Sequence, residues 1–92
     1  MKDAVGDLPG EDLVRQGLED LAAGKETVPA LLVSVGATRL RRTGVPIPLP
    51  IPDAENRLYL MLAGACGNDA HSRYNALIRK LVSFERALEC AR

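Results

Sequence analysis

Side chains suited to anion binding and directed hydrogen bonding are concentrated in the last third of the chain. His71, Asn75, Arg79 and Arg86 fall within one arc of a helical wheel, and Arg73 lies in the same stretch. Arginine presents a fixed fork of donors that matches carboxylates and phosphates. The pattern predicts a face that binds an anion or the carboxylates of a protein partner. The alternative interpretation is a solvated outer face without a ligand.

A second basic cluster, RLRR, places Arg39, Arg41 and Arg42 close together. With the arginines of the first set it offers six side chains for phosphate contacts, and such binding would depend strongly on salt. The pI of about 6.6 is below that typical of nucleic-acid-binding domains. Nucleic-acid or phosphate binding is therefore the second hypothesis for this chain, and is not favoured over a protein partner.

Residues with catalytic or metal-binding chemistry are few. Cys66, His71 and Cys90 supply three ligands, fewer than structural zinc needs, and their spacing matches no zinc motif. A Cys66–His71 nucleophile pair would also need an orienting group and an oxyanion site, neither of which the sequence specifies. We expect no enzymatic activity, no metal and no cofactor. Both cysteines are expected to be small buried hydrophobic residues.

Composition indicates one globular domain of 92 residues with a core of aliphatic side chains, because the chain has no Trp, two Tyr and one Phe. The formal net charge is zero, but its distribution is uneven. Residues 1–38 hold seven acidic and three basic side chains, whereas residues 39–92 hold five acidic and nine basic ones. The two halves can therefore attract each other within one molecule or between two.

The sequence begins without a basic and apolar leader, and its apolar stretches are too short to cross a bilayer. These features predict a cytoplasmic protein with reduced cysteines and no membrane contact.

Apolar periodicity predicts four helices. Their approximate bounds are 10–23, 28–43, 53–66 and 69–91. Residues 1–8 are expected to be frayed. Thr27 is a good N-cap with Pro29 in the following turn, and Gly24 and Gly44 are expected to end the first two helices.

Two of these helices contain nearly continuous apolar stretches, residues 30–37 and 58–65, and are expected to be buried. Asp53 is the predicted N-cap of the second of them. Gly36 and Gly64 lie inside these helices, where glycine costs about 1 kcal/mol relative to alanine. Each is therefore expected at a close helix crossing.

The last helix carries the clearest apolar seam. Its members recur at spacings of three and four residues and are Tyr74, Leu77, Leu81, Phe84 and Leu88, with Ile78 beside them. Such a seam faces a core or a partner helix. It would suit a homodimer if the intramolecular core left part of it exposed.

Residues 45–52, VPIPLPIP, alternate apolar side chains with prolines. Proline lacks the donor of a sheet ladder and favours an extended neighbour, so the segment should be polyproline II-like and span roughly 25 Å. That length lets the second and third helices run parallel, as in bundles with crossover connections. A docking ligand for a proline-recognising domain is the weaker alternative, because the PxxP spacing is absent.

Together these features predict an all-α fold, a single four-helix bundle-like domain with an extended crossover at residues 45–52. The first functional hypothesis is a small non-enzymatic protein-interaction domain that acts as a subunit, adaptor or regulatory partner, with a homodimer as one form. The second is the nucleic-acid- or phosphate-binding module.

Overall fold

The computed structural model describes residues 10–47 and 49–91, and these residues lie in helices, turns and loops without a strand. The helices are α1 (Glu11–Ala22), α2 (Val28–Val35), α3 (Ala37–Arg42), α4 (Ala54–Cys66), the short 3-10 helix η2 (Gly67–Asp69) and α5 (Ala70–Ala91). The predicted all-α class is confirmed. The expected fraying of residues 1–8 lies outside the described residues.

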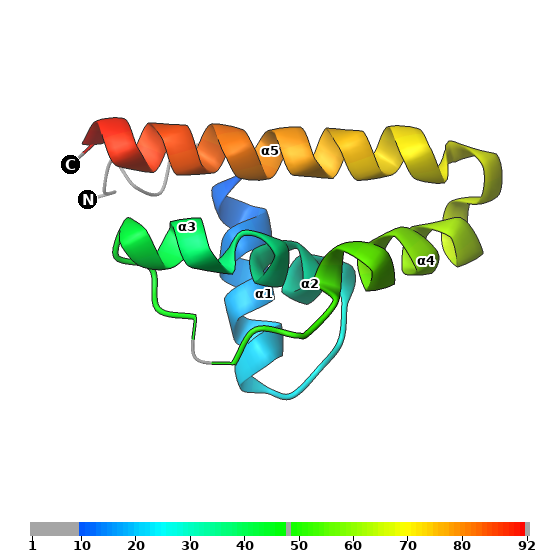
Figure 1. Ribbon diagram of the computed structural model, residues 1–92, viewed down its shortest axis with the longest axis horizontal. Coiled ribbons are helices and arrows are strands. Elements are labelled where there is room, and N and C mark those ends of the chain that lie inside the picture. Colours follow the sequence, from blue (N-terminus) through cyan, green and yellow to red (C-terminus); the bar gives the residue numbers. More distant parts are fainter. Residues whose placement is uncertain (1–9, 48, 92) are drawn as a thin grey trace.

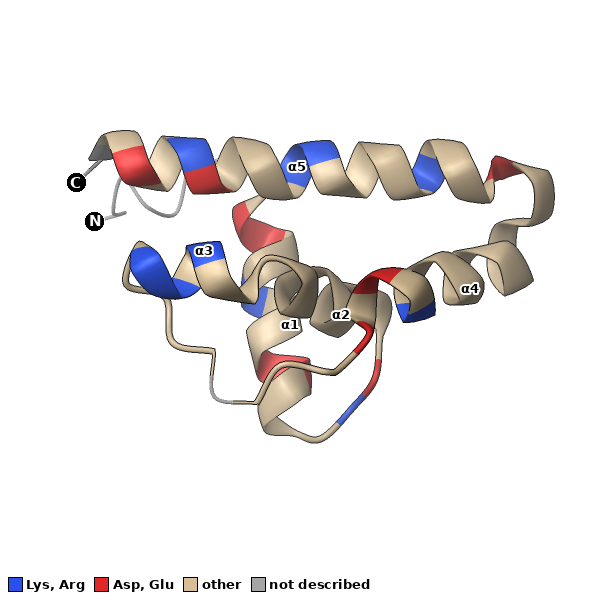
Figure 2. Cartoon of the chain, viewed as in Figure 1, with Lys and Arg blue, Asp and Glu red and all other residues tan. Residues whose placement is uncertain are grey.

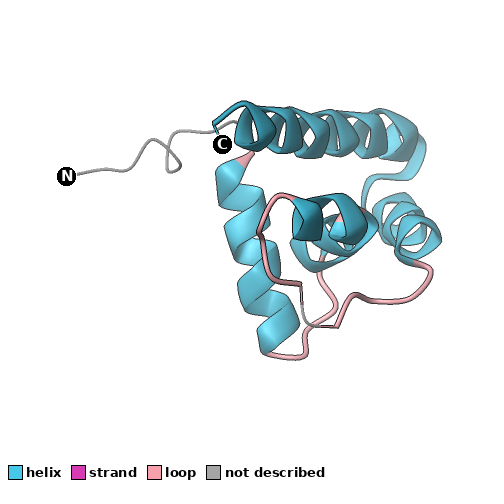
Figure 3. Cartoon of the chain, turned by 60° about the vertical axis from the view of Figure 1, so that its left-hand side comes forward, coloured by secondary structure: helices cyan, strands magenta, loops and turns pink. Residues whose placement is uncertain are grey.

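α5 is the longest helix and runs along the molecule, with α3, α2 and α4 beneath it in the view of Figure 1. α1 begins beside α5 and runs away from it at a steep angle, as Figures 1 and 3 both show. The contact between them is close, because a Cβ atom on Gly10 would lie 2.7 Å from the carbonyl oxygen of Lys80. One cluster of buried side chains joins all five α-helices.

Glycines end α1 and α3 as predicted. Gly24 has φ 75° and Gly44 has φ 97°, the left-handed conformation that glycine adopts at low cost. After α1, the Lys25 N–H donates to the Asp20 carbonyl at 2.8 Å, and the Gly24 N–H donates to the carbonyl of Leu21. This is the Schellman pattern, which satisfies the last carbonyls of the helix.

Thr27 caps α2 as predicted and also joins it to α1. Its Oγ1 accepts a hydrogen bond from the Ala30 N–H at 3.2 Å and donates one to Asp20 Oδ2 at 2.6 Å. The bond from Thr27 is the main reason that the pKa of Asp20 lies below its ordinary value of 3.8. One side chain therefore stabilises both the start of α2 and the contact between the helices.

Thr27→Val should destabilise the fold by about 1 kcal/mol through the lost cap alone. Because the pKa of Asp20 is lowered in the folded state, its contribution is present at neutral pH and is lost as the pH falls through that lowered value. The variant should therefore lose less stability on acidification than the wild type. Urea unfolding at neutral and acidic pH measures both effects. Thr38→Val, at an exposed position in α3, is the control and should change neither.

The predicted helix 28–43 is divided in the structure at Gly36, where the backbone has φ −93° and ψ 13°. Hydrogen bonds still cross the break, because Gly36 N–H donates to Leu32 and Leu40 N–H donates to Gly36. α5 lies directly against this point. A Cβ atom on Gly36 would lie 2.6 Å from Glu85 Oε2, so the close crossing predicted at this glycine is confirmed.

α4 is not the buried helix that its apolar sequence predicts. Leu58 is fully buried, but Leu60 is 61% exposed and Tyr59 is 38% exposed. A Cβ atom on Gly64 would meet nothing within 4 Å among the described residues, so the close crossing predicted there is wrong. The physical reason is that α2 and α5 pack against α4 on one side only.

The apolar seam of α5 faces the core of its own chain. Leu81 and Phe84 are buried, and Tyr74, Leu77, Ile78 and Leu88 pack against the core as half-buried side chains. The ring of Tyr74 meets that of Tyr59 edge to face, with centroids 5.7 Å apart. Most of the seam is therefore used within the molecule.

The segment after α3 turns back along α3 toward α2. Arg41 Nε donates to the carbonyl oxygen of Ile47 at 3.0 Å, and Ile51 N–H donates to Ser34 Oγ at 2.9 Å. Ile47 is 3% exposed, whereas Leu49 is 81% exposed. Val45 and Ile51 are partly buried against the core, so Leu49 is the apolar side chain of the segment that is exposed to solvent. Residue 48 lies outside the described part.

Asp53 is the N-cap residue of α4, as predicted, but its side chain makes no capping hydrogen bond. Its backbone has φ 56°, a left-handed conformation that aspartate tolerates better than most residues. Its carboxylate instead accepts a long hydrogen bond from Asn56 Nδ2 at 3.4 Å. The residue therefore turns the chain into the helix.

Candidate functional site

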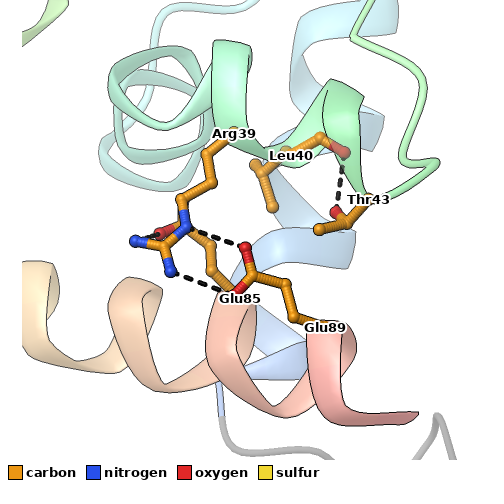
Figure 4. A network of polar contacts seen from close by, with 5 residues as sticks. All are labelled: Arg39, Leu40, Thr43, Glu85 and Glu89. Carbon is orange, nitrogen blue, oxygen red and sulfur yellow. Dashed lines mark hydrogen bonds and ion pairs between the residues drawn. The ribbon is translucent and has the colours of Figure 1, made fainter. Parts of the chain in front are cut away.

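Arg39 of α3 reaches across to α5 and binds two carboxylates (Figure 4). Its Nε and Nη2 each donate to Glu89 at 3.1 Å, and its Nη1 lies 3.7 Å from Glu85 Oε1. The two hydrogen bonds are the main cause that lowers the pKa of Glu89. The Arg39 guanidinium therefore joins α3 to α5. Its donors already bind carboxylates of the same chain, so it is not a vacant site for an outside anion.

Glu85 is the buried carboxyl of this group, with 3% of its surface exposed. Burial raises its pKa, and the nearby charge of Arg39 opposes that change. Glu85 is not among the predicted site residues, although the sequence carries a signal for it. It follows Ile78 by seven residues and Leu81 by four, which places it on the inner face of the helix.

A cleft of about 430 Å³ lies between the α2–α3 break, the start of α4 and the middle of α5. Its apolar floor includes Val35, Ile78 and Leu81. Polar side chains around the floor are Thr38, Arg39, Arg42, Glu55, Tyr74, Asn75 and Glu85. The cleft thus brings together three of the predicted binding residues, from α3 and from α5. Its mixed lining would accommodate an apolar group with a polar end.

The remaining members of the RLRR cluster have separate surroundings. Arg41 binds the carbonyl oxygen of Ile47 and thereby holds the segment after α3. Arg42 borders the cleft, and its charge helps to lower the pKa of Glu89. Arg39 and Arg42 therefore share the cleft and the neighbourhood of Glu89, whereas Arg41 is directed to the loop, so the three arginines do not form one anion-binding group.

The predicted residues on α5 are solvent-exposed. His71, Asn75, Arg79 and Arg86 share one side of the helix, which we call the basic face of α5, and Arg73 lies off that face. His71, Arg73, Asn75, Arg79 and Arg86 are all exposed, and His71 Nε2 lies 3.2 Å from Asn75 Nδ2. Among the described residues, Arg73, Arg79 and Arg86 make no ion pair of 4 Å or less. Arg86 nevertheless lies near enough to Glu89 to lower its pKa. Figure 2 shows these basic positions distributed along α5.

α4 contributes a surface of a different kind, which was not among the predicted sites. Tyr59, Leu60, Ala63 and Gly64 are exposed and lie close together on consecutive turns; we call them the apolar face of α4. The continuous apolar stretch of residues 58–65 did not indicate which side of the helix would be exposed. The signal in the sequence was Gly64, which was predicted to lie at an internal helix crossing.

Neither cysteine is fully buried. Cys66 is half-buried against the core, whereas Cys90 is exposed, so the predicted burial of Cys90 is wrong. The described residues contain no group of three or more His, Cys, Asp or Glu side chains placed to hold a metal ion. Within the same residues, no helix has both the length and the hydropathy needed to cross a membrane.

Comparison with known proteins found no match among protein-family models, curated proteins or solved structures. The functional interpretation therefore depends on the cleft, the basic face of α5 and the apolar face of α4.

Proposed function

We propose that this chain is a small non-enzymatic helical protein-interaction domain that acts as a subunit, adaptor or regulatory partner and can self-associate. The observation that carries the proposal is the apolar face of α4, where Leu60 is 61% exposed beside Tyr59, Ala63 and Gly64. Exposed apolar side chains that adjoin one another are typical of protein interaction sites.

Gly64 adds an energetic argument. Glycine inside a helix costs about 1 kcal/mol relative to alanine. Nothing among the described residues lies within 4 Å of a Cβ atom at this position, so internal packing does not offset that cost. The close approach of another chain would do so, because the missing side chain lets a second backbone come near.

The proposal keeps the expectation of a non-enzymatic, cytoplasmic protein without metal or cofactor. Within the cleft, Arg39 is paired with Glu85, and it also binds Glu89. The cysteines are free thiols, as expected in a reducing compartment.

We also propose that residues 45–52 are the extended crossover of a four-helix bundle-like domain. Three contacts support this assignment. Ile47 is buried in the core, its carbonyl oxygen accepts from Arg41, and the Ile51 N–H binds Ser34. These contacts attach the segment at both of its ends.

Leu60→Glu tests the apolar face of α4. The charge should weaken any association through this face by at least roughly tenfold, because burying a leucine contributes about 1.5–3 kcal/mol. It should leave folding stability within about 0.5 kcal/mol, since the side chain is exposed. Light scattering at low and high salt measures the solution mass. Leu49→Glu is the matched control, at an exposed leucine outside the face. Equal effects of the two variants would contradict the proposal.

Nucleic-acid or phosphate binding is retained as a second candidate because the basic face of α5 lacks ion-pair partners among the described residues. Phosphate binding would be lost as salt rises, whereas association through an apolar face would persist.

A further inference from the structure

The outer face of α5 carries a second regular stripe, opposite the buried seam. Its members recur at spacings of four and three residues and are Ser72, Ala76, Arg79, Ser83, Arg86 and Cys90, all exposed. The two arginines are seven residues apart, roughly 10 Å along the helix at 1.5 Å per residue. The other four side chains are small, so a partner could approach the helix closely between the two charges.

α1 carries an acidic counterpart. Asp12, Gln16 and Glu19 are exposed and follow the same spacing of four and three residues. Asp12 and Glu19 are also seven residues apart, and neither makes an ion pair of 4 Å or less with a described residue. Arg15, the one basic residue of this helix, is bound to Glu11 instead. The two carboxylates therefore remain available.

We propose that the outer face of α5 in one copy docks on the outer face of α1 in a second copy, with Arg79 and Arg86 paired to Asp12 and Glu19. The inference rests on the proposed interaction role but does not involve the apolar face of α4. Seven residues are close to two helical turns. Arg79 and Arg86 therefore share one face of α5, and Asp12 and Glu19 share one face of α1. The two spacings are equal, and both pairs can form at the same time.

A second copy fits these faces better than a nucleic acid. The net charge of the chain is zero, so no overall field attracts a polyanion. The acidic first turn of α1 also begins against the middle of α5, where Gly10 meets Lys80. A second copy brings its own acidic half to the basic face.

The contact should be weak and sensitive to salt, because exposed ion pairs each contribute only about 0.2–1 kcal/mol. A two-fold arrangement would let each copy offer α1 to α5 of the other and double the number of pairs. Such association is expected at low ionic strength, because the screening length is about 30 Å at 0.01 M salt. It should vanish near 1 M salt, where the screening length is about 3 Å.

The test is a charge exchange followed by sedimentation velocity at low and high salt. One variant carries Arg79→Glu and Arg86→Glu, and the other carries Asp12→Arg and Glu19→Arg. Each alone should associate at least roughly tenfold more weakly than the wild type, because attraction becomes repulsion at two positions. An equimolar mixture of the two should regain association, since each variant retains the partner that the other needs.

A matched control carries Arg73→Glu and Lys80→Glu, the same change of charge on the same helix but away from the stripe. It should associate as the wild type does. Equal loss in this control, or failure of the mixture to associate, would overturn the α5–α1 contact.

Association that survives every charge variant and disappears in Leu60→Glu would overturn the α5–α1 contact too, while supporting the interaction role. A wild type that stays monomeric at every salt concentration would contradict the contact and self-association together. A monomer that binds single-stranded DNA through Arg79 and Arg86 would favour nucleic-acid binding instead.

Discussion

Gly17→Ala is expected to cost about 3 kcal/mol or more of folding stability, the largest effect of a single methyl group that we expect in this chain. A Cβ atom at this position would lie 2.4 Å from the carbonyl oxygen of Pro29 and 2.8 Å from Val33 Cγ1. The first neighbour is backbone, so α1 and α2 must move apart to admit the methyl group. A domain of this size has a total stability of only about 5–15 kcal/mol, so the variant should be largely unfolded at moderate urea.

Gly64→Ala is the matched control for that experiment. It makes the same chemical change inside a helix, but nothing among the described residues lies within 4 Å of the added carbon. It should therefore stabilise the monomer by up to about 1 kcal/mol, the difference in helix propensity. Urea unfolding of both variants measures the contrast. If the two substitutions shifted the midpoint by the same amount in the same direction, the close α1–α2 contact would be refuted.

Ile47→Ala is expected to destabilise the fold by about 2–5 kcal/mol, the range for truncating a buried aliphatic side chain. Ile47 is 3% exposed and belongs to the core cluster, although it comes from a loop. Its removal should leave a cavity beneath the segment. It should also weaken the anchoring of that segment to Arg41, whose guanidinium binds the Ile47 carbonyl oxygen.

Leu49→Ala provides the comparison, two residues further along the same segment. Leu49 is 81% exposed, so its truncation should change stability by no more than about 0.5 kcal/mol. Chemical denaturation followed by circular dichroism is sufficient to measure both variants. Comparable losses at the two positions would contradict the burial of Ile47 beside an exposed Leu49, and an unaffected Ile47→Ala would exclude a structural role for this part of the segment.

Local chemistry explains which parts of the fold could be predicted. Thr27, Gly24 and Gly44 act through the backbone of their own turns, so neighbouring residues suffice to predict what they do. The seam of α5 was predictable because an intervening polar face marks its direction, and Leu81 and Phe84 are buried accordingly.

α4 shows why the remaining predictions failed. Its stretch of apolar residues has no polar face, so periodicity could not show which side would meet the core. The outcome depended on how many helices surround it, and packing on one side left Leu60 and Tyr59 exposed. The burial of Glu85 likewise required α5 to lie against Gly36.

The candidate binding residues likewise divide into those whose shared face follows from the sequence and those whose contacts depend on the tertiary structure. The sequence alone determined that Arg79 and Arg86 share a face with His71 and Asn75, because helical periodicity relates residues within one element. It also determined the opposite charges of the two halves of the chain.

Only the tertiary structure decided that Arg39 binds Glu85 and Glu89 across two helices, and that Arg41 holds the loop at Ile47. It also decided that the acidic first turn of α1 begins beneath the middle of α5, at Lys80 and Phe84. These contacts join residues far apart in the chain. Their partners depend on which helices pack together, and local propensity carries no information about that choice.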